Sequence, residues 1–110
     1  MTSRLTVEPQ ANGVLAIAGE LSLAEAPTLE HQLQEVLDAA TADVVLDLGG
    51  IEFIDSTGLG VLVRAHQRAS ERGISFRVCN ARTQARRLLS LTGLEGLLTG
   101  EESGTPDSRT

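Results

Sequence analysis

The chain has 110 residues, a formal net charge of −6 and 41% apolar residues, with Phe53 and Phe76 as its only aromatic side chains. This length suits one domain with a real core and excludes a second, independent substrate domain. The absence of Trp and Tyr predicts an aliphatic core and excludes an interface in which this chain supplies those anchors. The single cysteine, Cys79, cannot form an internal disulfide, which indicates a reducing compartment.

Charge is divided unevenly along the chain. Residues 1–63 hold ten acidic residues and one basic residue, whereas residues 64–94 hold seven arginines and one acidic residue. An arginine-rich stretch can be a nucleic-acid footprint, but the acidic balance of the whole chain and the lack of stacking aromatics argue against it. We therefore expect a solvated basic face and no direct contact with nucleic acid.

The first residues predict an antiparallel hairpin. Leu5 and Val7 alternate with polar neighbours, residues 9–13 carry turn chemistry that includes Asn-Gly, and an apolar run follows over residues 14–21. No apolar segment approaches the length of a membrane span, and no signal-peptide core precedes the hairpin. These features predict a cytoplasmic domain that does not enter a membrane.

An amphipathic helix follows, with apolar residues at helical spacing from Ala26 to Ala40. Its start is ambiguous. Ser22 and Glu25 match a capping box, while Pro27 favours a first helical position slightly later. We expect the helix to begin between residues 23 and 27.

The remaining segments alternate between strands and helices. Residues 43–48 predict a central strand covered on both faces. A second amphipathic helix follows residues 53–60 and ends at Gly73, and residues 74–78 alternate as a strand. Asn80 is expected to cap a third helix that stops at Gly93.

Leu97 and Leu98 predict a last short strand, and residues 100–110 lack apolar side chains and predict a flexible polar tail. The fold class is therefore α/β, with one domain over residues 1–99. Its mixed sheet has an N-terminal antiparallel hairpin and parallel strands joined by helices.

The most informative segment runs from Phe53 to Gly60, because it places two hydroxyls, a carboxylate and two glycines where a helix begins. A helix start presents free N–H groups and the positive end of the helix dipole, so it tolerates an anion such as a phosphate on Ser56. The simpler interpretation is that Asp55 or Ser56 only caps the helix while the glycines allow close packing.

Catalytic interpretations of this segment fail. A hydrolase nucleophile elbow needs glycine at the position of Ile54. His66 would lie about 15 Å down the helix on its apolar side, and His31 falls among charged residues of the first helix. The residues provide no metal-ligand cluster, and Val63 replaces the third glycine of a dinucleotide fingerprint. We therefore expect no enzyme activity, no metal and no cofactor.

Three blocks carry a family resemblance: Gly19-Glu20-Leu21, residues 44–48 followed by residues 53–62, and Arg86-Arg87-Leu88-Leu89 followed by Leu91-Thr92-Gly93-Leu94. Over residues 3–99 the chain resembles the STAS-domain family of bacterial anti-sigma factor antagonists. The resemblance implies that Ser56, with Thr57 as runner-up, is phosphorylated by a partner that is both anti-sigma factor and serine kinase. The unphosphorylated antagonist would hold the anti-sigma factor and free sigma, and a serine phosphatase would reverse the modification.

The resemblance also implies a partner-binding surface around this segment. Asp55 would hold the loop, Gly58 and Gly60 would let the partner's backbone approach, and Leu59, if exposed, would give an apolar contact; Ser56 and Thr57 complete the segment. Ser22 replaces an aspartate that the family often has, which alters the kinase contact or provides a helix cap with Glu25.

Two other expectations remain open beside the switch. Many relatives carry a final helix after the last strand, and here a polar tail is expected in its place. The domain is expected to be a monomer or weak dimer. It could instead be a constitutive STAS assembly module of a stress-signalling or lipid-transport complex, or a small serine hydrolase, which covalent labelling of Ser56 by an activated phosphonate would reveal.

Overall fold

A four-stranded sheet in the order β1-β2-β3-β4 organises residues 5–100, which are the residues that the computed structural model describes. The elements are β1 (Leu5–Pro9), the 3₁₀ turn η1 (Ala11–Gly13), β2 (Val14–Leu21), α1 (Ala26–Ala39), β3 (Val44–Ile54), α2 (Ser56–Glu71), β4 (Phe76–Cys79), α3 (Thr83–Leu91) and α4 (Glu95–Thr99). Strand β1 is antiparallel to β2, and β2, β3 and β4 are parallel. The predicted α/β fold with its N-terminal hairpin is therefore confirmed.

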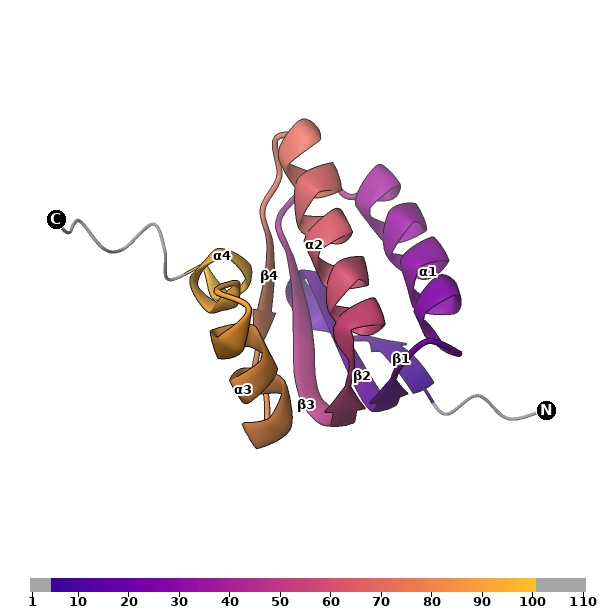
Figure 1. The fold of residues 1–110 in the computed structure, drawn as a ribbon. Coiled ribbons are helices and arrows are strands. Elements are labelled where there is room, and N and C mark those ends of the chain that lie inside the picture. The colour runs from indigo at the N-terminus through magenta and orange to yellow at the C-terminus, as the bar shows by residue number, and fades with distance from the viewer. Residues whose placement is uncertain (1–4, 101–110) are drawn as a thin grey trace, which may run out of the picture.

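The helices α1 and α2 lie side by side on one face of the sheet, and α3 and α4 lie beside the β4 edge (Figure 1). The first helix begins at Ala26 with Pro27 in its first turn, within the predicted interval. The second helix ends at Glu71, and Gly73 adopts a left-handed φ of +74° after it. Both helices connect parallel strands, so both helix starts lie at the carboxyl ends of the preceding strands.

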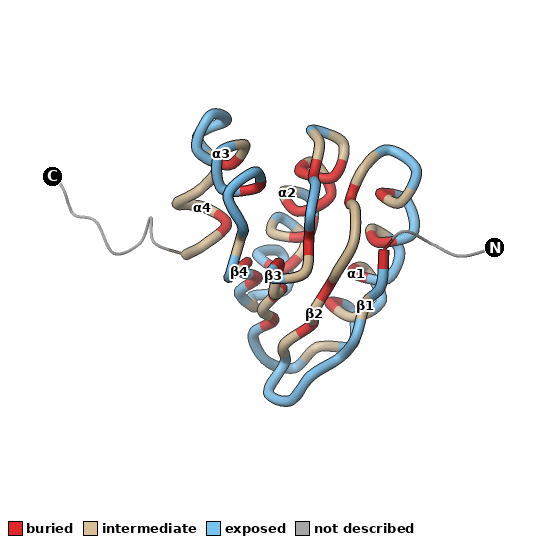
Figure 2. Tube along the Cα trace, turned by 90° about the horizontal axis from the view of Figure 1, so that it is seen from below, coloured by how far each residue is buried: buried red, intermediate tan, exposed pale blue. Residues whose placement is uncertain are grey.

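Strand β3 is longer and less deeply covered than the sequence predicts. Residues 44, 46 and 48 are buried, whereas Val45 and Asp47 are only half-buried, as the alternating colours along the strands illustrate (Figure 2). The prediction of a strand covered on both faces is therefore wrong, because apolar Val45 on the outer face hides the alternation in the sequence. The strand also continues past Gly49 and Gly50 to Ile54, directly before the candidate site.

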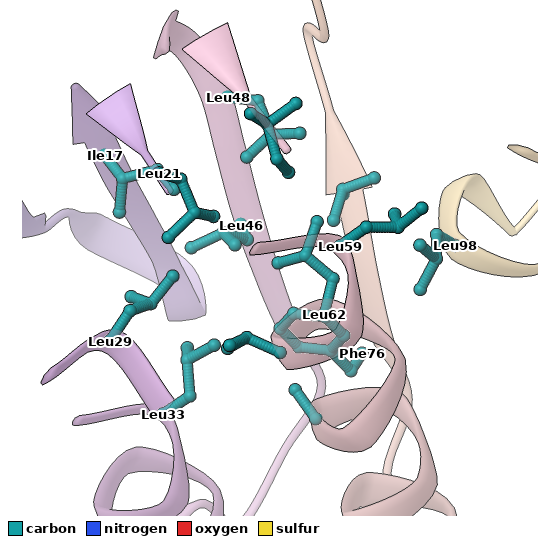
Figure 3. Packing of buried hydrophobic residues seen from close by; sticks show 14 of the residues in the cluster. Ile17, Leu21, Leu29, Leu33, Leu46, Leu48, Leu59, Leu62, Phe76 and Leu98 are labelled. Atoms are coloured by element: carbon teal, nitrogen blue, oxygen red, sulfur yellow. The ribbon is translucent and has the colours of Figure 1, made fainter. Parts of the chain in front are cut away.

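The core is aliphatic, as predicted, and Phe76 is its one aromatic side chain among the described residues. Leu59 and Leu62 of α2 point into it between the sheet and the side chains of α1, with Phe76 of β4 close by and Leu98 of α4 at the far side (Figure 3). No polar or charged residue of the described range is buried as a whole. Packing of these side chains fixes α2 against the sheet and so positions its first residues.

The predicted strand near the end of the described chain is wrong. Leu97 and Leu98 belong to helix α4, because Leu94 and Leu98 lie one turn apart and the N–H of Leu98 donates to the Leu94 carbonyl at 3.0 Å. A short helix therefore stands in place of the predicted strand, and the expectation that no helix follows it concerns residues outside the described range. The predicted flexible tail, apart from Gly100, lies outside the described residues.

Asn80 does not cap α3. It adopts a left-handed φ of +59° in the turn after β4, and the N-cap position belongs to Arg82, which makes no side-chain capping bond. Asparagine tolerates this conformation through local hydrogen bonding, so the residue type indicates a turn as readily as a cap.

The basic stretch is not simply a solvated face, because two of its arginines pair with carboxylates of α1. Arg64 contacts Glu30 through two nitrogens, and Arg68 binds Asp38 through two hydrogen bonds of 2.8 Å each. The two halves of the sequence, opposite in charge, therefore meet across the α1–α2 contact. The hydrogen bonds from these arginines lower the pKa of the Glu30 and Asp38 carboxyls.

We expect the combined substitution Glu30→Gln and Asp38→Asn to remove a small, pH-dependent contribution to the free energy of unfolding. A carboxyl group whose pKa is lower in the folded chain stabilises the fold at pH values above its unfolded-state pKa of about 4. This contribution is lost as the pH falls through the folded-state pKa. Urea unfolding between about pH 2.5 and 7 should show the variant less stable at neutral pH and equal to the parent at the acid end. Glu8→Gln, on β1, is the control; a difference that persists unchanged at low pH would contradict the pairing.

Candidate functional site

The candidate site lies where β3 ends and α2 begins. Asp55 has an extended backbone and its Oδ1 accepts a hydrogen bond from the Gly58 N–H at 2.9 Å. Of the two capping residues that the sequence left open, the structure therefore selects Asp55. Ser56 becomes the first residue of α2, and its hydroxyl is not needed for capping.

The two hydroxyls of the segment differ in access. Ser56 is exposed, and its hydroxyl makes no hydrogen bond within residues 5–100. Thr57 is half-buried. A kinase needs an accessible hydroxyl that can enter another protein's active site, and Ser56 meets that requirement better than Thr57.

Gly58 and Leu59 are both buried, so neither offers a surface to a partner. A Cβ on Gly58 would lie 2.5 Å from the Leu21 carbonyl oxygen and 2.7 Å from Leu21 Cγ. The backbone that approaches Gly58 is therefore the chain's own strand β2. Leu59 is 4% exposed, and the condition for its expected partner contact is not met. Gly60 is half-buried, and only the Arg64 guanidinium lies near its Cβ position.

The turn that contains Ser22 lies next to the candidate site, because the Asp55 N–H donates to the Leu21 carbonyl at 3.2 Å. The Ser22 carbonyl accepts from the N–H groups of Glu25 and Ala26 at 3.0 and 2.9 Å, which closes the turn. The expected capping box is not formed, since Glu25 occupies the N-cap position and makes no side-chain capping bond. Ser22 thus belongs to the rim of the site rather than to the helix cap.

Two exposed apolar side chains flank this rim, and the sequence reasoning did not single out either as a binding residue. Leu23 is 71% exposed in the turn before α1, and Phe53 is 43% exposed one residue before the end of β3. Gly19 of β2 pairs with Ile51 of β3, but the next residue, Glu20, pairs with Phe53, so the register is irregular at this point. Simple alternation along β3 therefore does not predict where Phe53 lies. The scarcity of aromatics was the one signal that could have drawn attention to Phe53.

The catalytic alternatives have no partners at this site. His66 is half-buried on α2, and His31 pairs with Glu35 at 3.3 Å on the outside of α1. Within residues 5–100, no group of three or more His, Cys, Asp or Glu residues could hold a metal ion. Burial and the neighbouring Asp47 carboxylate raise the pKa of the Cys79 thiol, which keeps it protonated at neutral pH. A solvent-exposed hydroxyl without a neighbouring base is a poor catalytic nucleophile, but it is suitable as the acceptor of a phosphoryl group from another enzyme.

Residues 5–99 match the family model described as "Mlab, STAS domain". The chain belongs to the STAS domain family. The resemblance inferred from the three sequence blocks is thereby confirmed. No helix among the described residues is both long and apolar enough to cross a membrane.

Individual similar proteins carry regulatory names. The anti-sigma-B factor antagonist of Bacillus subtilis is 30% identical over 99 residues, which cover 89% of this chain and 90% of that protein. An anti-sigma factor antagonist from Mycobacterium paratuberculosis has a solved structure with a TM-score of 0.73 at 32% identity, covering 86% of this STAS domain and 82% of that chain. Such antagonists are regulatory binding proteins and not enzymes, in agreement with the prediction for this chain.

A second solved structure shares the fold alone. The Bacillus cell fate determinant SpoIIAA, solved in its phosphorylated form, superimposes with a TM-score of 0.65 at 19% identity over 90% of this chain and 95% of that one.

Proposed function

We propose that this STAS domain is an anti-sigma factor antagonist whose affinity is controlled by phosphorylation of Ser56. The unmodified domain binds an anti-sigma factor and thereby frees the sigma factor. The bound anti-sigma factor is a serine kinase that phosphorylates Ser56 and then dissociates, and a phosphatase restores the hydroxyl. The observation that carries this proposal is the exposed, unbonded Ser56 hydroxyl at the capped start of α2 in a chain similar to such antagonists.

The electrostatics of the α2 start support a switch that acts on binding rather than on folding. A phosphate adds about −1.5 to −2 charges directly beside the Asp55 carboxylate. The Gly58 N–H already bonds Asp55, so the helix start offsets only part of the repulsion, about 0.3–2 kcal/mol. Water solvates the dianion at an exposed residue, whereas inside an interface an unpaired dianion keeps most of its desolvation cost.

The test is a pull-down from an extract of the native cells with the tagged chain, with and without ATP. We expect mass spectrometry to identify an anti-sigma factor in the sample without ATP. Addition of ATP should release it and add one phosphate to Ser56. Phosphate on Thr57 would move the switch by one residue. A kinase-free complex that ATP does not affect would favour the constitutive assembly module.

We expect Leu23→Ser and Phe53→Ser each to weaken the complex with the recovered anti-sigma factor by roughly tenfold or more. Both side chains are exposed apolar groups in the two segments that meet at the start of α2, and such groups contribute most when a partner covers them. Calorimetric titration measures the affinity, and the thermal midpoint should stay near that of the parent because neither side chain is in the core.

Leu91→Ser is the matched control, since Leu91 is 78% exposed at the last residue of α3. An equal loss of affinity in all three variants would mean that exposed apolar area in general, and not the rim around Ser56, drives the association.

A further inference from the structure

Strand β3 extends beyond its neighbour β4 toward the candidate site. Pairing with β4 covers Val44 to Asp47, whereas pairing with β2 continues to Ile54 opposite Leu21. At the Ser56 end, β3 therefore has a strand on one side only. Ile54 is only 2% exposed, so water does not reach its backbone N–H and C=O groups on the side away from β2. These groups need another hydrogen-bond partner.

The side chain of Gln84 supplies that partner. Its Oε1 accepts from the Ile54 N–H at 2.9 Å, and its Nε2 donates to the Ile54 carbonyl at 2.8 Å. One primary amide thus satisfies both backbone groups of a single residue, in the donor and acceptor pattern that a neighbouring strand would present. Gln84 acts as a one-residue substitute for β4 where β4 has ended.

Gln84 is well placed to hold the strand, because it lies in the first turn of α3. The next residue, Ala85, is buried, as is Leu89 one turn later, and these side chains fix α3 on the core. On the opposite side of the chain, the Asp55 N–H donates to Leu21. The two residues before Ser56 are therefore held from both sides.

We propose that Gln84 is a positioning residue for Ser56, which it holds in place by pairing with Ile54. The proposal rests on the proposed role of Ser56 as a kinase substrate. Gln84 itself contacts neither the hydroxyl nor the kinase. It fixes the end of β3, and thereby the Asp55 cap and the orientation in which Ser56 is presented.

The chemistry requires an amide at the length of glutamine. Asparagine is one methylene shorter, and methionine has the length but neither hydrogen-bonding group. Ionised glutamate keeps an acceptor for the Ile54 N–H but turns its second oxygen toward the Ile54 carbonyl, where two acceptors repel. Protonated glutamic acid regains a donor, so a glutamate at this position should make both bonds with Ile54 only at acid pH.

Amide hydrogen exchange followed by NMR tests the pairing without any partner. In Gln84→Met we expect protection of the Ile54 amide to fall about tenfold or more, while that of Leu46 in the middle of β3 is unchanged. Gln84→Glu should lose part of this protection near pH 7, because repulsion at the Ile54 carbonyl weakens the pairing, and regain it below about pH 4, relative to the parent at the same pH. Comparison with the parent at each pH removes effects of pH that do not involve residue 84.

Phosphorylation by the anti-sigma kinase recovered from the pull-down tests the consequence for Ser56. We expect Gln84→Met to lower kcat about tenfold with KM within about threefold, since positioning acts on the reacting geometry. Gln67→Met, an exposed glutamine of α2, is the control and should match the parent. Unchanged Ile54 protection, no recovery of Gln84→Glu at acid pH, or unchanged kcat would each overturn the proposal. If the parent is not phosphorylated at all, the switch fails, and the exchange data still decide whether Gln84 holds the strand.

Discussion

Ser56→Asp is expected to weaken binding of the anti-sigma factor by about 100-fold without unfolding the domain. Two unit charges about 6 Å apart at an effective dielectric near 20 repel by roughly 3 kcal/mol, and each 1.4 kcal/mol is a factor of ten in affinity. The new carboxylate would stand beside Asp55 inside the interface, whereas in the free domain water and the helix start accommodate it. Titration calorimetry and thermal unfolding measure the two effects separately.

Two further variants separate the charge at Ser56 from charge in general. Ser56→Ala should bind like the parent and should no longer be released by ATP. Ser70→Asp places the same charge on an exposed residue of α2, about 21 Å along the helix, and should leave the affinity within about threefold of the parent. Tight binding by Ser56→Asp, or equal weakening by Ser70→Asp, would contradict the proposed switch.

Gly58→Ala is expected to lower the free energy of unfolding by about 2 kcal/mol and the melting temperature by about 10 °C. The added Cβ would lie 2.5 Å from the Leu21 carbonyl and 3.0 Å from Ile54 Cγ1, so the start of α2 must move away from β2. This overpacking exceeds the gain in helix propensity, which is at most about 1 kcal/mol. Urea unfolding at neutral pH measures the difference.

Gly60→Ala is the matched control, two residues further along α2. Its Cβ would meet only the Arg64 guanidinium, at 3.2 Å, and that side chain can move. We expect stability equal to the parent or higher by up to about 1 kcal/mol. If both alanine variants were equally unstable, loss of glycine flexibility and not the contact with β2 would explain the effect.

Local signals in the sequence were sufficient for most of the fold. Asn-Gly between two apolar runs specifies the hairpin, apolar spacing specifies α1 and α2, and Gly73 marks the end of α2. Each of these signals depends on residues that are close together in the chain, and the backbone sterics that form turns and helices also act between such residues. The position of Ser56 at the helix start followed from Asp55 and the preceding strand in the same way.

Features that depend on contacts distant in sequence were not predicted. Leu59 was expected to contact a partner only if it was exposed, and helix packing buries it. The exposure of Phe53 follows an irregular register with β2, and the pairing of Gln84 with Ile54 joins residues 30 positions apart. Leu97 and Leu98 fit a strand or a helix equally well, and packing against the rest of the domain decides between them.

The positions at which the described chain begins and ends determine where a reporter can be attached. Leu5 pairs with Gly19 near the carboxyl end of β2, close to the Ser56 rim, whereas Gly100 lies beside Arg77, which pairs with Val45 at the start of β3 (Figure 1). Gly100, the last described residue, therefore lies away from the Ser56 rim, whereas Leu5, the first described residue, lies near it. For immobilised binding assays, attachment through the carboxyl-terminal side leaves the Ser56 end free to meet its partner.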